Sequence, residues 1–285
     1  MSKSFAFVFP GQGSQSVGML DGWGDHPAVR QTLQEASDAL GEDVARLIHE
    51  GPKEALGLTT NTQPVMLVAA EVLTLAQAAP LVRLRAAAMQ EAVPVGVGAM
   101  AAILGMDAAR VIAGCAEAAG TFDPASGEVV EAVNFNDPAQ TVIAGTKAGV
   151  DKACELLKAA GAKRALPLPV SAPFHSSLMK PAADKLRAAL ADLPLAAPRI
   201  PVVNNIDVAV QADADAIRDA LYRQAFGPVR WVECVQALKA RGVTHIVECG
   251  PGKVLAGLTK RIDPELVGVP LYDPATLAET RDLLA

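Results

Sequence analysis

The stretch from Val97 to Pro169 limits the folds open to this chain more than any other, because it holds six predicted elements in close succession. Apolar runs of strand length alternate there with segments whose apolar residues recur at helical spacing, and turn residues separate them. The order strand, helix, strand, strand, helix, strand is that of a ferredoxin-like subdomain. The strands are predicted at 98–104, 128–134, 140–144 and 163–169, and the helices at 107–119 and 147–160.

The rest of the chain has a different pattern, in which single strands alternate with helices and a parallel α/β sheet is favoured. Those strands are predicted at 5–9, 200–204 and 244–248. We therefore predict an α/β protein with two subdomains. A large subdomain with a parallel sheet takes residues 1–95 and 172–285, and a ferredoxin-like small subdomain, residues 96–171, is inserted into it.

Composition argues against several classes of protein. The net charge of −6 does not favour a nucleic-acid binder, because such proteins present basic surfaces. The first residues lack an apolar signal segment, and no apolar run reaches about 18 residues without a charge, so no membrane is indicated. None of the four cysteines forms a C-x-x-C pair, so neither a zinc site nor a disulfide framework is signalled. The sequence predicts a soluble cytoplasmic protein without metal or cofactor.

One histidine lies between an extended segment and a helix. Before His175 the chain is apolar and interrupted by Pro167 and Pro169, and after it apolar residues recur at helical spacing. Ser176 or Ser177 could cap that helix. Imidazole titrates near neutral pH, so a side chain held at such a corner suits a general acid–base. The simpler interpretation is that His175 only caps the helix or fills a surface gap.

The first strand ends in a glycine-rich loop, Pro10-Gly11-Gln12-Gly13-Ser14-Gln15. The glycine spacing, continued by Gly18, matches neither the dinucleotide fingerprint nor the Walker loop, so a phosphate site is weakly supported. Glycines let the backbone approach a ligand closely, and the backbone N–H of Gln12 could point at a developing oxyanion. A plain turn from strand to helix is the alternative.

The stretch from Pro64 to Ala92 looks helical throughout, which is unusually long for a globular helix. Within it, Thr74 and Gln77 have the spacing of a capping box, the signature of a helix start, and Pro80 follows. The pattern therefore predicts that one helix ends at Leu73 and the next begins at Thr74, without turn residues between them. Because helices need a connection of at least about two residues, we interpret this point as a junction where sequence is absent.

Several motifs, in this order, resemble those of the malonyl-CoA:acyl carrier protein transacylases of fatty-acid synthesis and the related polyketide acyltransferase domains. They cover nearly the whole chain. The matching segments are Phe7 to Gln15, Thr62-Gln63-Pro64, Arg83 to Gln90, Gly96 to Ala102, Val133 to Asn136, the stretch around His175, Pro201 to Asn205, and Gly250 to Leu255. The resemblance implies a hydrolase-like large subdomain with an inserted ferredoxin-like one, as the element pattern predicts.

The resemblance also implies a mechanism. A serine on a nucleophile elbow takes malonyl from malonyl-CoA and passes it to the phosphopantetheine thiol of acyl carrier protein. His175 matches the general base that activates this serine, and Gln12 matches the residue whose backbone N–H helps to form the oxyanion hole. Gln224 matches a residue whose backbone carbonyl orients the imidazole.

Other matching positions concern the substrates. Arg85 matches the arginine that binds the free malonyl carboxylate, for which its planar fork is suited. Phe174 is similar to versions that take malonyl rather than bulkier groups, and Met89 falls in the same substrate-binding set. Carrier proteins of this kind are generally acidic, so a locally basic docking surface is expected. Its candidates are Lys163, Arg164, Lys185 and Arg187.

The chain departs from the family at the nucleophile, because it contains no Gly-His-Ser-x-Gly elbow. In the family this elbow lies between the helix of Thr62-Gln63-Pro64 and the helix carrying Arg85, where the two helices abut here. A strand, an elbow and a helix would take roughly 25–30 residues. Either the natural protein has this segment and the sequence omits it, or the segment is deleted. The omission is favoured, because loss of a core strand leaves backbone groups unpaired.

Two other functions stay open at this point. One is a non-catalytic relative that binds carrier protein or acyl-CoA without turnover. The other is a hydrolase that uses a different serine, for which Ser14 is the candidate.

Overall fold

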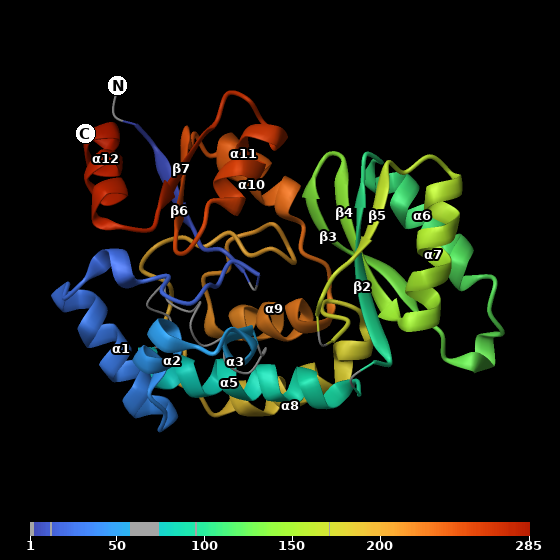
Figure 1. Ribbon diagram of the computed structural model, residues 1–285, viewed down its shortest axis with the longest axis horizontal. Helices are drawn as coiled ribbons and strands as arrows, with labels where there is room; N and C mark the ends of the chain where they lie inside the picture. The colour runs from blue at the N-terminus through green and yellow to red at the C-terminus, as the bar shows by residue number, and fades with distance from the viewer. Residues whose placement is uncertain (1–2, 12, 58–73, 95, 171) are drawn as a thin grey trace. The chain divides into compact units, whose positions relative to one another are not determined.

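The computed structural model describes residues 3–11, 13–57, 74–94, 96–170 and 172–285. The chain divides into two compact units, each of which is described by itself (Figure 1). The first unit comprises Met1–Ala86, Leu193–Ile200 and Val235–Ala285, and the second comprises Ala87–Asp192 and Pro201–Cys234.

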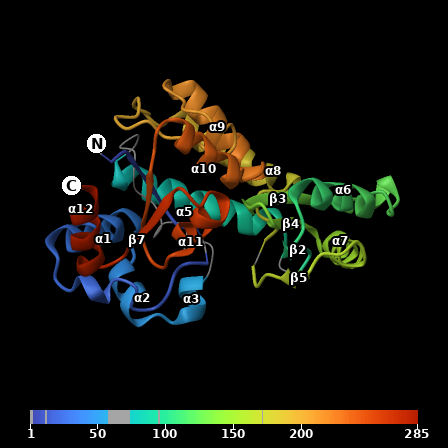
Figure 2. The ribbon, with the colours of Figure 1, turned by 90° about the horizontal axis from the view of Figure 1, so that it is seen from above.

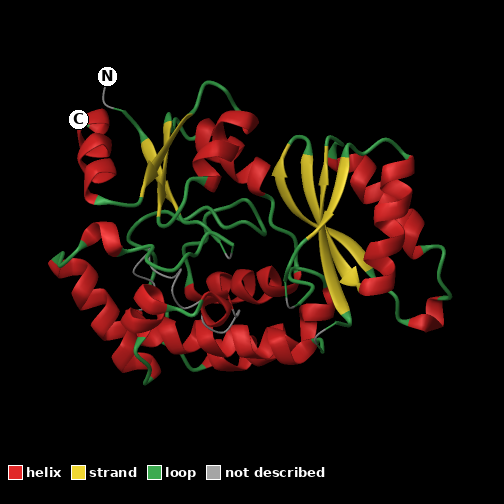
Figure 3. Ribbon diagram, viewed as in Figure 1, coloured by secondary structure: helices red, strands yellow, loops and turns green. Residues whose placement is uncertain are grey.

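The first unit contains a parallel sheet whose described strands lie in the order β1-β6-β7 (Figure 3). These strands are β1 (Phe5–Val8), β6 (His245–Cys249) and β7 (Val267–Leu271). The predicted strands at 5–9 and 244–248 are thereby confirmed, and β7 is an addition to them. The described helices of this unit are α1 (Pro27–Leu40), α2 (Val44–Glu50), α3 (Lys53–Gly57), α11 (Val254–Ile262) and α12 (Pro274–Leu284), with a short 3-10 helix, η1 (Asp21–Trp23).

The second unit contains the antiparallel sheet that the pattern of elements predicts, in the strand order β3-β4-β2-β5. Helices α6 and α7 lie against the same face of this sheet in both views (Figures 1 and 2). The core between sheet and helices is apolar, and Ile103, Val111, Ile143 and Leu157 are almost fully buried in it. The elements are β2 (Gly98–Leu104), α6 (Ala108–Ala119), η2 (Pro124–Ser126), β3 (Val130–Asp137), β4 (Gln140–Thr146), α7 (Lys147–Ala159) and β5 (Arg164–Pro167).

Three further elements complete the second unit. They are η3 (Ser177–Met179), α8 (Lys180–Ala191) and α9 (Ala214–Phe226). Helices α8 and α9 pack against each other along their length. α10 (Trp231–Ala240) begins in this unit and continues into the first.

The predicted strand at 200–204 is wrong. Val203 forms only an isolated antiparallel bridge with Val210. The reason is a local turn, since the side chain of Asn204 accepts a 2.8 Å hydrogen bond from the backbone N–H of Asp207 and reverses the chain.

The helix start predicted at Thr74 is confirmed. α5 (Leu75–Ala92) follows directly, and Thr74 and Gln77 form the reciprocal bonds of a capping box. Pro80 lies inside this helix. Leu73 is outside the described residues, so the junction between Leu73 and Thr74 stays a prediction. None of the helices in the described ranges is both long and apolar enough to cross a bilayer.

Candidate active site

His175 occupies a strained corner in the second unit, between β5 and η3. Its φ angle is +64°, in the left-handed region that residues with a side chain seldom adopt. The fully buried Ser176 fixes the corner, because its hydroxyl donates a 2.6 Å hydrogen bond to the carbonyl of Pro173. The hydrogen bond of the neighbouring residue therefore helps to fix the backbone conformation that directs the imidazole of His175.

The imidazole of His175 contacts Gln224 on α9. Its Nδ1 lies 3.3 Å from the backbone oxygen of Gln224 and 3.2 Å from the side-chain Nε2 of the same residue. If Nδ1 carries the proton it donates to the carbonyl, and Nε2 of the imidazole then keeps the lone pair that a general base needs. The structure thus places the two residues that the family resemblance paired within hydrogen-bond distance of each other.

The helix that follows His175 is capped by a residue that is far from it in the sequence. Ser176 is the N-cap residue of η3 but makes no side-chain capping bond, contrary to the expectation from the sequence. Instead the backbone N–H of Ser177 donates a 2.8 Å hydrogen bond to the carboxylate of Glu131 on β3. The sequence reasoning missed Glu131. The available signal was a carboxylate within the apolar strand between Val130 and Val133.

Two of the predicted substrate-binding residues lie in the interior of the same unit. Phe174, next to His175, is 8% exposed, and Met89 on α5 is fully buried. Both can therefore contribute apolar walls rather than surface contacts. Their predicted role in holding the acyl group stays a prediction.

Arg85 also lies on α5, but in the part that belongs to the first unit. Burial lowers the pKa of its guanidinium to about 10, so the side chain is still a cation at neutral pH. Gln12 is outside the described residues, and its predicted part in an oxyanion hole is not placed.

The loops after β1 and β6 approach each other at the carboxyl ends of these two parallel strands, where ligands bind in open α/β sheets. A Cβ atom at Gly250 would lie 2.9 Å from Cγ of Pro10, so the contact requires glycine. Glu248, at the end of β6, is fully buried and accepts a 2.8 Å hydrogen bond from the backbone N–H of Ala256. It thereby fixes the start of α11.

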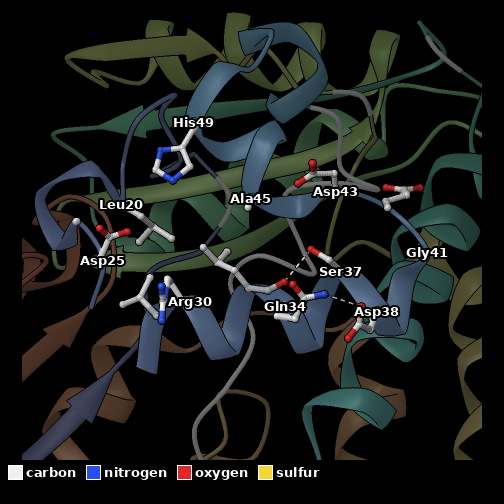
Figure 4. Close-up of a pocket in the computed structure, with 14 residues that line it drawn as sticks. Leu20, Asp25, Arg30, Gln34, Ser37, Asp38, Gly41, Asp43, Ala45 and His49 are labelled. Carbon is white, nitrogen blue, oxygen red and sulfur yellow. Dashed lines mark hydrogen bonds between the residues drawn. The ribbon is translucent and has the colours of Figure 1, made fainter. Parts of the chain in front are cut away.

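A separate cavity of about 730 Å³ lies beside α1 and α2 in the first unit (Figure 4). Its lining mixes apolar side chains with charged ones, and along α1 the side chain of Gln34 donates a hydrogen bond to Asp38. None of the predicted site residues lines this cavity. Throughout the described ranges, the cavity included, no three His, Cys, Asp or Glu side chains form a group that could hold a metal ion.

Comparisons with known proteins identify the family. Residues 65–262 match the acyl transferase domain model. The malonyl CoA-acyl carrier protein transacylase of Escherichia coli strain K12 is 48% identical, with 98% of this chain and 99% of the relative covered. The crystal structure of an acyl-carrier-protein S-malonyltransferase from Burkholderia pseudomallei superposes with a TM-score of 0.94 at 60% identity, covering 98% of this chain and 99% of the other.

A third similar structure is a malonyl-transacylase solved in complex with a type II PKS acyl-carrier protein. It has a TM-score of 0.94 and 44% identity, and the match covers 99% of each chain. The alignment with the Escherichia coli relative runs over 312 positions, 27 more than the 285 residues of this chain. Some positions of the relative therefore have no residue opposite them here. The fold is that of the solved malonyltransferases, and the chain belongs to the acyl transferase domain family, among the malonyl CoA-acyl carrier protein transacylases.

Proposed function

We propose that the protein transfers a malonyl group from coenzyme A to the phosphopantetheine thiol of acyl carrier protein. The observation that carries the proposal is the contact between His175 Nδ1 and the Gln224 carbonyl, in a chain of this family. With Nδ1–H held by the carbonyl, imidazole Nε2 accepts the proton of the attacking hydroxyl and returns it to the departing thiolate. Each transfer moves the acyl group from one thiol to the enzyme and then to the other, so no redox partner is consumed.

The charge of Arg85 supports a substrate with a free carboxylate. Burial lowers the pKa of this guanidinium only to about 10, so it stays a cation at neutral pH, and its planar fork is suited to a bidentate pair with a carboxylate. The buried Phe174 and Met89 would limit the size of the acyl group. In the proposal the backbone N–H of Gln12 stabilises the oxyanion of the tetrahedral intermediate.

The nucleophile is the part of the proposal that the 285-residue sequence does not supply, since no elbow motif is present. The alignment with the Escherichia coli relative contains positions without a residue opposite them here, as an absent segment would produce. The proposal places an acyl-serine on that segment. Without that segment, the proposed base His175 would have no elbow serine to activate.

The missing elbow favours one alternative function. A relative without a nucleophile would bind carrier protein or an acyl-CoA and release it unchanged. Under that alternative the contact between His175 and Gln224 persists as structure, but no covalent acyl-enzyme forms.

Acyl carrier protein is the proposed partner, in the cytoplasm. Of the basic residues that could meet its acidic surface, Lys163 and Arg164 are exposed. Lys185 is paired with Glu91 at 2.7 Å, and Arg187 lies 3.5 Å from the ring centroid of Tyr222. The first two are therefore the better candidates for docking contacts, because the other two already have partners within the protein.

The experiment is malonyl transfer with purified protein, malonyl-CoA and holo acyl carrier protein, together with the intact mass of the protein after exposure to malonyl-CoA. Transfer with one added malonyl group supports the enzyme, and His175→Ala should lower the rate by roughly 10²–10⁴. His49→Ala, which removes a histidine paired with Asp21 in the other unit, is the matched control. Binding without transfer or a covalent adduct supports the alternative, and activity lost in Ser14→Ala alone would support the hydrolase.

A further inference from the structure

Strand β3 forms hydrogen bonds to the chain shortly after each member of the His175–Gln224 pair. On one side, Glu131 accepts the hydrogen bond from the Ser177 N–H, two residues after the histidine. On the other, β3 bonds to the chain just after α9, the helix that carries Gln224. Two hydrogen bonds make this second link, from the Val229 N–H to the Val133 carbonyl at 2.7 Å and from the Phe135 N–H to the Val229 carbonyl at 2.9 Å.

The two links differ in how easily they can be replaced. The link between β3 and Val229 is an isolated β-bridge made by backbone atoms, so side-chain changes leave it in place. The link to Ser177 depends on a single carboxylate. It is charge-assisted, and it satisfies one of the N–H groups that every helix start leaves without an intrahelical partner. Negative charge at this position is also favoured by the dipole of the helical segment that follows.

The hydroxyl of Ser176, the N-cap residue, restrains the same corner through its bond to the Pro173 carbonyl, and it makes no capping bond to the helix. Because His175 has a left-handed backbone, relaxation of the corner towards an ordinary φ would swing the imidazole away from Gln224. The carboxylate on β3 opposes that relaxation.

We propose that Glu131 is a positioning residue, which holds the corner so that Nδ1 of His175 stays on the Gln224 carbonyl. The inference rests on the proposed role of His175 as the base. Glu131 is outside the set of residues that the family resemblance supplies. Its role would link the antiparallel sheet to the position of the proposed base. Glu131 itself touches no reacting atom in this proposal.

The test compares Glu131→Ala with Glu131→Gln in the full chain. Glutamine keeps an oxygen acceptor of the same length, whereas alanine removes it. We expect exchange of the Ser177 amide hydrogen to quicken by about tenfold or more in Glu131→Ala. The ring ¹⁵N shifts of His175 should then move from those of a single Nδ1–H tautomer to those of a mixture. Glu131→Gln should restore both signals most of the way.

Glu128→Ala is the matched control, because this nearby carboxylate bonds to the hydroxyl of Thr146 and not to the histidine corner. It should leave the His175 ring shifts unchanged. The proposal is overturned if Glu131→Ala also leaves them unchanged, or if Glu128→Ala changes them equally.

These signals do not depend on turnover, so they stay informative if the proposed transfer activity fails. If the protein does transfer malonyl groups, Glu131→Ala should lower kcat about tenfold with little change in KM, since the base and not the substrate pocket is disturbed. A loss confined to KM would contradict the positioning role.

Discussion

The two sheets of this protein differ in how well their own chain covers them. In the antiparallel sheet of the second unit, Ala101, Ile103 and Ile143 are completely buried under α6 and α7. In the parallel sheet of the first unit, Phe5, Phe7 and Phe9 are 44%, 49% and 39% exposed. Parallel sheets are normally covered on both faces, so the exposure of three phenylalanines in and just after β1 is unusual.

The difference in coverage is located at one edge strand of the parallel sheet. β1 pairs with β6 and is an edge of the sheet within the described ranges, and an apolar edge strand is usually paired or covered. Removal of a strand and a helix from this sheet would leave such an edge. The segment 98–167, by contrast, contains every element of its own sheet. We infer that the unit that holds the proposed general base has its complete sheet, and that the unit expected to hold the nucleophile does not.

The largest expected effect comes from restoring the segment. We would insert the corresponding residues of the Escherichia coli relative between Leu73 and Thr74. Loss of a catalytic serine costs on the order of 10⁶ in kcat, so the insertion should raise malonyl transfer by several orders of magnitude. The same insertion with its elbow serine changed to alanine is the control. If both insertions are equally active, or equally inactive while folded, the comparison between the two halves does not explain activity.

The second prediction concerns stability. Ile143→Ala should lower the free energy of unfolding by about 2–5 kcal/mol, because it opens a cavity in a closed core. Phe7→Ala removes a half-exposed ring and should cost about 1 kcal/mol or less. Urea denaturation measures both. In the restored chain the cost of Phe7→Ala should rise towards that of a buried phenylalanine, and equal costs in the two chains would show that β1 gains no cover.

Local signals in the sequence anticipate most of the second unit. The helix starts at Asp107 and Asp213 are marked by acidic caps, and each side chain accepts the expected backbone bond. A turn follows at Pro138, but β3 extends to Asp137, three residues beyond its predicted end at 134. These features depend on neighbours within four residues, which is why the printed sequence suffices for them.

Long-range contacts are what the sequence could not give. The hydrogen bond that the Ser177 N–H donates to Glu131 joins residues 46 apart. The strand predicted at 200–204 is wrong for a local reason, the turn around Asn204. The contact between His175 and Gln224 was available only through the family resemblance. The proposed limits of the insert, 96–171, are still a prediction, since the compact unit that contains them extends further.

The third prediction compares ion pairs in the two units under acid. The hydrogen bond from Arg223 lowers the pKa of Asp207, in a two-pronged pair at 2.6 and 3.0 Å. A lowered folded pKa means that the stabilisation is complete above the ordinary carboxyl pKa of about 4 and is lost as the pH falls through the folded value. Asp207→Asn should therefore destabilise the protein by about 1–2 kcal/mol at pH 7 and by much less near pH 3.

The matched change in the first unit is Asp263→Asn. Lys239 lowers the pKa of Asp263 in the same direction, but through a single ammonium contact rather than a two-pronged guanidinium pair. Its effect at pH 7 should be the smaller of the two. Denaturation at both pH values, in low and high salt, separates them, and an Asp207 effect that persists unchanged at pH 3 would rule out the ionic explanation.

The smallest expected effect bears most directly on the junction. If Thr74 is a helix start, Thr74→Ala removes the acceptor of the hydrogen bond that the Gln77 N–H donates to the Thr74 hydroxyl. The loss should destabilise the protein by about 1 kcal/mol, as Asp107→Ala should at the start of α6. If the helix instead ran on through residue 73, alanine would be the better helix former, and the same substitution would stabilise the protein by a few tenths of a kcal/mol. The sign of the change thus decides between a native helix start and a continuous helix.

Thr74→Ser keeps the capping oxygen and should retain most of the stability. The same loss in the chain with the restored segment would show that the cap belongs to the natural helix and that the sequence is interrupted immediately before it.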